Sequence, residues 1–323
     1  MPEPSKSSLR TRPRSFKAFF AIVGTTWLEA IQQPAAFLTV LTSVAFTLLV
    51  PILQMHLFGE EGRLARDSAL SCLLLFGLVL IAGTAVRSVG GEISSGMAAA
   101  VIGKPVGRLL YLLAKMTGVY CVALSYAVAQ VPAMLLAQRC SAHTITTSDF
   151  TGVVSDPLTL LLALLSLGVV MFVAALLHYF RGIRFGVAVF AGLAFSQVAM
   201  LIVSECTRKM IALDFRALPA AALVLLALAV FAAAVSALSV RLRPGAVFAG
   251  AFVLLFSGLA GDSLPSWMSG FVPDLQNFWL CDALAHGGSI SPGYIFSAAL
   301  YAVVCCAVFA TLGYLMFRNK DLG

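Results

Sequence analysis

Long apolar runs separated by short polar stretches dominate this chain. A membrane-spanning helix needs roughly 20 consecutive apolar residues, and all but one of the runs reach that length. The exception, Ala246–Gly261, is shorter and contains glycines, so it either spans or is re-entrant. The pattern predicts an all-α, polytopic membrane protein with about eight (six to eight) transmembrane or re-entrant helices. The runs are Ala36–Met55, Ala69–Ser88, Leu109–Ala137, Leu158–Phe180, Phe185–Cys206, Ala220–Val240, Ala246–Gly261 and Tyr294–Phe317.

The residues ahead of the first run divide into two parts. Residues 1–14 are polar and basic, and we expect a disordered tail. Over residues 15–33, aromatic and aliphatic side chains recur every three or four positions and form one apolar stripe on a helix. This pattern suits an amphipathic helix in the membrane interface, an elbow before the first span. Alternatively the helix is only the entry to that span. Residues 34–323 then form a single transmembrane domain.

A polar, glycine-rich stretch over residues 89–108 separates the second run from the third. It is too polar to cross a bilayer, but its apolar positions recur at helical spacing, which predicts a short amphipathic helix. Lys104-Pro105 should end that helix, because the residue before a proline is pushed out of the α region. A short helix between two spans can act as a handle for a soluble partner. The apolar positions are Ile93, Met97, Ala100 and Val101.

Composition and charge support the membrane interpretation and give an orientation. The chain is 60% hydrophobic and 11% charged, whereas soluble proteins carry about 25% charged residues. The net charge of +7 does not indicate nucleic-acid binding, because most basic residues lie in short loops beside apolar runs, where they set orientation. Their distribution predicts a multi-pass protein of the cytoplasmic (inner) membrane with both termini and residues 89–108 in the cytoplasm. Of the 21 lysines and arginines, those on the outer side would be Arg63, Arg66, Arg139, Arg208, Lys209 and Arg216.

The sequence indicates no nucleotide, metal or catalytic site. A phosphate-binding loop needs Gly-x-x-x-x-Gly-Lys-Ser/Thr, and the nearest stretch, residues 96–104, has the wrong glycine spacing. The chain is therefore not expected to hydrolyse ATP by itself. The four histidines are scattered and the cysteines form no Cys-x-x-Cys pair, so no metal site is expected. Cys140 and Cys281 fall in loops predicted to be outside, as either a disulfide or two unrelated thiols.

The polar residues deep in the predicted spans are neutral. Carriers and pumps that move protons place Asp, Glu or His near the midplane, whereas this sequence puts its charged residues near span ends. We interpret most deep neutral residues as helix contacts. Gln130 and Gln197 are the candidates for lining a substrate path.

The segment over residues 262–293, just before the last run, contains no lysine or arginine. Aromatic side chains favour the headgroup level of a bilayer, so we expect a re-entrant segment that lies on or dips into the outer leaflet. Its aromatic residues include Trp267, Phe271, Phe278 and Trp279.

The stretch between the second and third runs carries an ordered set of residue types: Glu92, Gly96, Lys104, Pro105, Arg108 and Lys115. This order resembles the loop between the second and third spans of ABC exporter permeases of the second type. Met97 and Gly107 depart from the threonine and serine that are common there. Two further segments are similar to the same family. Residues 273–278 resemble the core of its re-entrant hairpin, and residues 317–322 resemble its basic tail.

The resemblance covers roughly residues 15–137 and 262–323, and the central spans match poorly because the family usually has six. It implies a membrane-spanning subunit of an ATP-driven exporter, whose loop docks on a separate ABC ATPase subunit. ATP and magnesium would belong to that partner, with no cofactor in this chain. A homodimer, or a pair with a similar permease subunit, would form the path across the lipid bilayer. The coupling residues implied are Glu92, Gly96, Ala99, Lys104, Pro105 and Arg108, and those of the re-entrant segment are Pro273, Asp274 and Phe278.

The substrate stays open at this point, as does the choice between a homodimer and a heterodimer. Two alternatives to the exporter are a secondary transporter and a non-transporting membrane scaffold. The lack of midplane charge in the sequence disfavours the first.

Overall fold

Helices make up nearly all of the computed structural model, which describes residues 12–53, 62–98, 107–147, 150–207, 213–261 and 272–318. Seven of the described helices are long and apolar enough to cross a membrane. The predicted all-α, polytopic fold is therefore confirmed, and the protein is a multi-pass membrane protein. The seven helices are α2 (Pro34–Leu53), α3 (Arg63–Ala85), α6 (Arg108–Cys140), α7 (Pro157–Arg181), α8 (Phe185–Thr207), α9 (Ala217–Ser239) and α12 (Pro292–Arg318).

Local sequence signals set these bounds close to the predicted runs. Several of the helices begin at proline, which suits the first helical position because its missing N–H would have no partner there. The Asp156 side chain caps α7 by accepting a 3.2 Å hydrogen bond from the backbone N–H of Thr159. The same helix ends at Gly182, whose φ of 64° costs a glycine little because it lacks Cβ. The short run Ala246–Gly261 corresponds to the short helix α10 (Pro244–Leu259).

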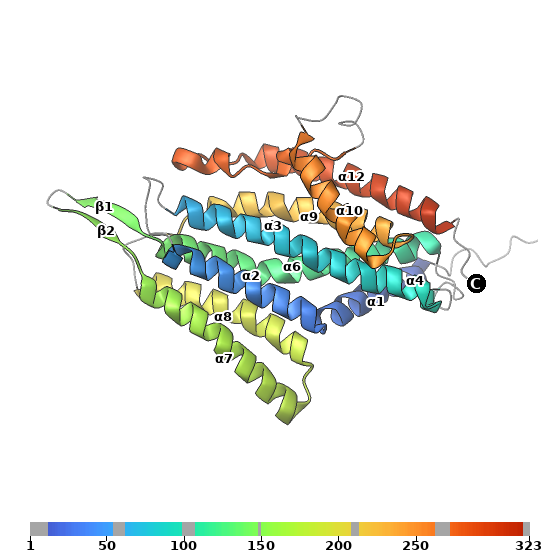
Figure 1. Cartoon of the computed structure of the whole chain (residues 1–323), viewed down its shortest axis with the longest axis horizontal. Coiled ribbons are helices and arrows are strands. Elements are labelled where there is room, and N and C mark those ends of the chain that lie inside the picture. Colours follow the sequence, from blue (N-terminus) through green and yellow to red (C-terminus); the bar gives the residue numbers. More distant parts are fainter. Residues whose placement is uncertain are drawn as a thin grey trace, which may run out of the picture.

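Most helices lie roughly side by side along one bundle axis (Figure 1). The centre holds α3, α6 and α9, while α7 and α8 pair on one side and α10 and α12 lie on the other. One end, which we call the hairpin end, carries the antiparallel strands β1 (His143–Thr147) and β2 (Phe150–Val154). The opposite end, which we call the terminal end, carries the start of α1 (Arg12–Ile31) and the end of α12. The hairpin was not predicted, because no apolar run marks it.

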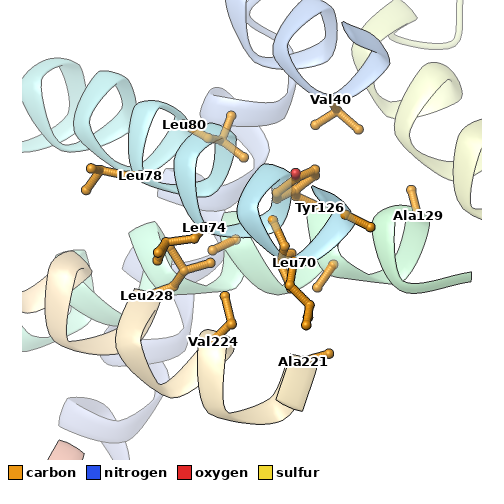
Figure 2. Close-up of a cluster of buried hydrophobic side chains, with 14 of the residues drawn as sticks. Val40, Leu70, Leu74, Leu78, Leu80, Tyr126, Ala129, Ala221, Val224 and Leu228 are labelled. Atoms are coloured by element: carbon orange, nitrogen blue, oxygen red, sulfur yellow. The ribbon is translucent and has the colours of Figure 1, made fainter. Parts of the chain in front are cut away.

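The core forms where α3 passes between its neighbours (Figure 2). Leu74 of α3 lies beside Leu228 of α9, and a Cβ on Gly77 would come within 2.7 Å of the Leu228 side chain. Lipid tails are as apolar as leucine, so close approach at small residues, rather than exclusion of water, holds such helices together. The alanine-rich α9 supplies much of this contact surface.

A bend at Gln32 and Gln33 joins α1 to α2 (Figure 1). α1 packs along the first half of α6, where the Trp27 Nε1–H donates a 2.7 Å hydrogen bond to Ser125 Oγ. A Cβ on Gly118 would come within 2.7 Å of Thr26, so these two helices touch closely. A helix does precede the first span, and its location in the membrane interface stays a prediction.

α3 does not end where the second apolar run ends. It continues through a π-helical segment, η1 (Val86–Gly91), into α4 (Glu92–Ser94), and the continuous helix has 32 residues. The chain turns at Gly96, where φ is a left-handed 74°. The expectation that Ile93 and Met97 share one helical face is wrong, because this turn separates them. Ile93 is buried in the long helix, whereas Met97 is 57% exposed.

Candidate functional site

A buried polar cluster at the terminal end joins Glu92 to α6. Lys115 Nζ donates a 2.5 Å hydrogen bond to Glu92 Oε1, and the Tyr111 hydroxyl donates one of 2.6 Å to Glu92 Oε2. Tyr111 and Lys115 stand four residues apart on α6, so both side chains reach the same carboxylate. The Lys115 side chain is only 4% exposed and that of Glu92 16%. We call Glu92, Tyr111 and Lys115 the clamp.

The end of α12 closes over the clamp. Phe317 is fully buried, and its ring stacks on that of Tyr111 with 5.9 Å between the centroids. The Arg108 guanidinium lies 5.9 Å from the centroid of the same phenylalanine, a cation–π distance, and its Nη1 donates a 3.0 Å hydrogen bond to the carbonyl of Arg318. Two segments that the sequence singled out separately, the polar loop and the chain's last residues, therefore meet in space.

The clamp lies near one end of the membrane-spanning region. α6 has 33 residues and a length of about 50 Å, which exceeds the roughly 30 Å of bilayer hydrocarbon. Lys115 is seven residues into α6, or about 10 Å from its first residue. At this depth the charged pair holds two helices together at the membrane boundary without placing a charge at the midplane.

The predicted coupling residues have different surroundings. Gly96 ends the helix that leaves the bundle and Arg108 begins the helix that re-enters it, so the two mark the edges of the loop. Glu92 was expected to meet a partner's basic group or to stabilise a helix amino terminus. Instead it stands at the carboxyl end of the continuous helix, and both of its carboxylate oxygens accept hydrogen bonds from α6. Ala99, Lys104 and Pro105 lie outside the described residues.

After α10 the chain re-enters the bundle. α10 has 16 residues, about 24 Å, which is too short for the bilayer hydrocarbon. Residues 272–280, which we call the return segment, begin beside the end of α10, where the N–H of Leu275 donates a 3.1 Å hydrogen bond to the carbonyl of Gly258. The return segment contains η3 (Gln276–Phe278) and packs against the middles of α3 and α9. The side chains that meet there are Leu74, Val224, Ala227, Phe231, Leu259, Leu275, Phe278 and Trp279.

The return segment leads back to the hairpin end. Asp282, at the start of η4 (Asp282–Gly287), pairs with Arg63 at the start of α3, with 2.9 Å between Arg63 Nη2 and Asp282 Oδ1. α10 and the return segment therefore form one crossing that is broken in its middle. Together with the seven long helices, this crossing gives an even number of crossings, so α12 ends at the terminal end, where α1 begins.

The three predicted residues of the re-entrant segment are held by α10 and α12. The carbonyl of Pro273 would lie 2.9 Å from a Cβ on Gly258, and the buried Phe278 ring lies 5.9 Å from that of Tyr301. The backbone N–H of Asp274 donates a 2.8 Å hydrogen bond to the Tyr301 hydroxyl. The Asp274 carboxylate accepts two bonds of 3.0 Å, from the N–H of Gln276 and from the side-chain amide of Asn277.

Gln130 belongs to a buried hydrogen-bond network between α2, α3 and α6. Its Nε2 donates a 2.7 Å hydrogen bond to Thr47 Oγ1, and its Oε1 accepts one of 3.2 Å from Ser43 Oγ. Ser43 also lies 2.5 Å from the Tyr126 hydroxyl, which donates to the carbonyl of Cys72 at 3.0 Å. Such a network joins three helices where no water is available.

Gln197 of α8 is equally buried but poorly bonded. Its Nε2 reaches Ser166 Oγ and Ser196 Oγ only at 3.4 Å, and its Oε1 has no partner within the part of the chain that the structure describes. A part for Gln130 or Gln197 in a substrate path stays a prediction.

An apolar cavity of about 240 Å³ opens between α6, α9 and α12, next to the cluster that surrounds the clamp. It lies one helical turn beyond Tyr111 toward the hairpin end, so a ligand there would touch the same helices that the clamp fastens. Its lining residues include Met116, Tyr120, Ala233, Cys306 and Ala310.

Cys140 and Cys281 are both buried, and no disulfide joins them in this structure. Cys281 follows the return segment and lies beside the charged group at the start of α3. Burial raises the pKa of the Cys281 thiol to about 12, and the carboxylate of Asp67 adds to this shift while the Arg66 guanidinium opposes it.

No family model, curated protein or solved structure matched this chain. The likeness to ABC exporter permeases therefore rests on the residues named in the sequence analysis.

Sequence reasoning missed two features of these sites. The pairing of Glu92 with Lys115 had a signal, because opposite charges flank one loop between two apolar runs. The location of Asp274 had a weaker signal in the sequence, because no lysine or arginine that could pair with it occurs between Arg243 and Arg318.

Proposed function

We propose that this chain is the membrane-spanning permease subunit of an ATP-driven ABC exporter. In this proposal a separate ATPase subunit docks on the polar loop between Gly96 and Gly107. The observation that carries it is the clamp, because the clamp fastens the two helices that flank this loop to each other.

A contact on the loop would act on three helices at once. Glu92 stands at the end of the α3–η1–α4 helix, Lys115 belongs to α6, and Phe317 of α12 packs on Tyr111. Close-packed protein interiors have low compressibility and transmit strain. A push on the loop therefore displaces the ends of these helices together, which suits a coupling element better than a flexible linker would.

The remaining parts of the proposal follow from orientation and from the apolar surface. The terminal end faces the cytoplasm of the inner membrane, where the partner binds ATP and magnesium. A second copy, or a similar permease, completes the path between the two subunits. An apolar cavity beside α6 and α12 favours amphipathic cargo.

The test is a photo-crosslink from the edge of the loop. Met97 is 57% exposed, so p-benzoylphenylalanine placed there should reach a docked subunit. After irradiation of native membranes, we expect an adduct between this chain and a protein that is labelled by azido-ATP. The same probe at Val153, which is 58% exposed at the hairpin end, should give no such adduct.

Two outcomes separate docking from coupling. If Met97 gives no nucleotide-labelled adduct, the ATPase does not bind here and the proposal fails. If the adduct forms, the double variant Lys115→Met with Glu92→Gln should keep it but lower the stimulation of ATP hydrolysis, because it removes the charged pair without leaving either charge unpaired.

A secondary transporter is the second candidate, and one observation favours it. The backbone of Asp274 bonds to Tyr301 of α12, partway along the bundle, and no ion pair among the described residues includes its carboxylate. Transport driven by an ion gradient in vesicles that contain this chain alone would support the second candidate over the first.

A further inference from the structure

Asp274 lies partway along the bundle, between the hairpin end and the end of α10, and is partly exposed. Its backbone N–H bonds to the hydroxyl of Tyr301, which stands nine residues, or about 13 Å, into α12 from the hairpin end. The next residue, Leu275, packs with Leu74 near the middle of α3. A bilayer hydrocarbon region is about 30 Å thick. The carboxylate is therefore placed at a depth where ionisable groups are rare and mark ion or substrate pathways.

Nothing on the described chain balances the charge of this carboxylate. The two hydrogen bonds that it accepts come from neutral donors, the N–H of Gln276 and the amide of Asn277. No lysine or arginine occurs between Arg243 and Arg318, and no ion pair among the described residues includes Asp274. The nearby carboxylate of Asp282, in contrast, is paired with Arg63. Charges away from water are normally paired, so a bound cation would take the place of the missing basic group.

The end of α10 makes the surroundings of Asp274 more negative. Leu259, the last residue of α10, accepts a 2.9 Å hydrogen bond at its carbonyl from Gln276 Nε2. A Cβ on Gly261 would come within 3.6 Å of Asp274 Oδ1, so the chain leaving α10 runs past the carboxylate. The carboxyl end of a helix carries about half a negative charge. Together the helix end and the carboxylate attract a positive charge and repel a negative one.

The other groups that face Asp274 do not supply a compensating charge. α12 contributes the hydroxyls of Tyr294 and Tyr301, of which Tyr294 donates a 2.8 Å hydrogen bond to the carbonyl of Asn277. α10 has no titratable side chain over Pro244–Leu259. At this level α3 and α9 contribute apolar side chains such as Leu74 and Val224. A broken crossing whose half-helix ends meet polar side chains at mid-depth is the arrangement in which transporters bind cations.

We propose that Asp274, with the carboxyl end of α10, is a cation-binding site within the membrane. The occupant carries one positive charge: an inorganic monovalent cation, or the cationic group of a transported molecule. This inference goes beyond the proposed coupling function and does not depend on whether an ATPase binds the loop.

The site is tested by the thermal stability of the purified full-length protein in detergent. The probes are sodium chloride and tetraphenylphosphonium chloride, each compared with N-methylglucamine chloride at equal ionic strength. At least one probe should raise Tm in the wild type, because a ligand that binds only the folded state stabilises it. Asp274→Asn should lose that rise. Asparagine keeps an oxygen that can accept the hydrogen bond from Gln276 but carries no charge.

The responding probe identifies the occupant. A response to sodium assigns an inorganic cation, and a response to the organic cation assigns the cationic part of a cargo. Asp282→Asn is the matched control, since its carboxylate is 92% exposed and already paired. It should respond as the wild type does.

Two results would overturn the inference. One is that Asp274→Asn keeps every response of the wild type, and the other is that the wild type responds to no probe. If Asp274→Asn does not fold, Asp274→Glu decides the matter, because it keeps the charge and should keep the response. If Asp274→Glu folds but does not respond while Asp282→Asn does, the inference is also rejected, because a carboxylate at this position would then not be enough to bind the cation.

Discussion

Lys115 reaches from α6 to Glu92, 23 residues earlier in the chain, and their Nζ and Oε1 atoms lie 2.5 Å apart. This contact spans the polar loop between the second and third membrane-spanning helices, so the loop closes between two fixed points rather than between two independent helix ends. The hydroxyl of Tyr111 bonds to the other oxygen of the same carboxylate. A carboxylate whose two oxygens both accept hydrogen bonds can hold two helices in register, but the loss of either partner then destabilises the contact.

Removing one partner of this pair should destabilise the fold. Lys115→Met leaves the Glu92 carboxylate buried and without its cation, and breaking a buried pair in this way costs about 3–5 kcal/mol. The double variant Lys115→Met with Glu92→Gln should recover much of that loss, because neither charge is then left unpaired. Unfolding in detergent, followed through a double-mutant cycle, measures both effects.

The exposed pair at the hairpin end provides the comparison. Asp282→Asn breaks a contact in which the Asp282 side chain is 92% exposed, and exposed pairs contribute about 0–1 kcal/mol. Equal losses for Lys115→Met and Asp282→Asn would show that the clamp is no stronger than a surface contact.

The start of α8 presses directly on the bend between α1 and α2. A Cβ on Gly186 would lie 2.1 Å from the carbonyl oxygen of Ile31 and 2.8 Å from the Cα of Gln32. Backbone atoms cannot move aside as a flexible side chain can, so Gly186→Ala should cost about 1–3 kcal/mol, the usual penalty of overpacking. Thermal unfolding of the purified variant is the measurement.

Gly168 of α7 is the control for this substitution. It is also helical, but a Cβ there would meet no atom within 4 Å. Gly168→Ala should therefore stabilise the helix by roughly 0.5–1 kcal/mol, because alanine loses less backbone entropy than glycine does. A loss of stability in both variants would mean that close approach is not what Gly186 provides.

The two buried glutamines should respond differently to removal of their amides. Gln130→Leu removes the hydrogen bonds to Thr47 and Ser43, of which only Ser43 keeps a bond with Tyr126, and an unsatisfied buried group costs about 1–3 kcal/mol. Gln197→Leu removes an amide whose oxygen has no partner in the described structure, so this variant should lose less stability than Gln130→Leu does. Guanidinium unfolding compares them. If Gln197→Leu changes transport without changing stability, Gln197 lines a path rather than a helix contact.

Alkaline pH should weaken the region around Cys281. Its pKa is raised from 9.0 to about 12 by burial, so the folded state keeps the proton longer than the unfolded state does. The contribution of this thiol is fully present below pH 9 and is lost as pH rises from about 9 to about 12. Wild type and Cys281→Ala should therefore diverge in the pH dependence of Tm over that range. Parallel curves would show that Cys281 ionises normally in the folded protein.

The chain's apolar pattern predicted the helices because membrane spans are set by length and apolarity, and proline or glycine brackets several of them. Contacts between charged residues that are far apart in sequence were harder to predict. Glu92 was expected to meet a partner's basic group or to stabilise a helix amino terminus. The opposite charges that flank the loop were the one sign of its pairing with Lys115, and the local pattern does not show that Tyr111 faces it too. The π-helical segment over Val86–Gly91 has no sequence signal that separates it from the surrounding helix.

The return segment shows a second limit. Aromatic residues suggested the headgroup level, but Phe278 and Trp279 pack beside the middles of α3 and α9. An aromatic ring fits a membrane interface and a buried core equally well, so composition alone does not fix its depth. Asp274 follows its neighbours inward, because the short α10 leaves the chain at that level.

The loop itself is tested by a steric block. The turn at Gly96 is followed by Met97, which is exposed, and by Ala98, which is fully buried. Ala99 and Ala100 come next in the sequence, and such small residues let a partner approach closely. Ala99→Trp should lower association with the ATPase at least about tenfold, equivalent to about 1.4 kcal/mol, while Tm changes little because the clamp and the spans are intact. Co-purification and stimulated ATP hydrolysis are the measurements, and Val153→Trp at the hairpin end is the control.

Glu92→Lys is not an equivalent probe of docking. It would bring a second ammonium group against Lys115, whose side chain is 4% exposed, and like charges at this distance destabilise a buried site. We therefore expect Glu92→Lys to lose stability first and association as a consequence, whereas Ala99→Trp loses association alone. Wild-type association and stimulation in Ala99→Trp would remove the loop from the coupling mechanism, because a tryptophan at a docking surface cannot be accommodated without displacing the partner.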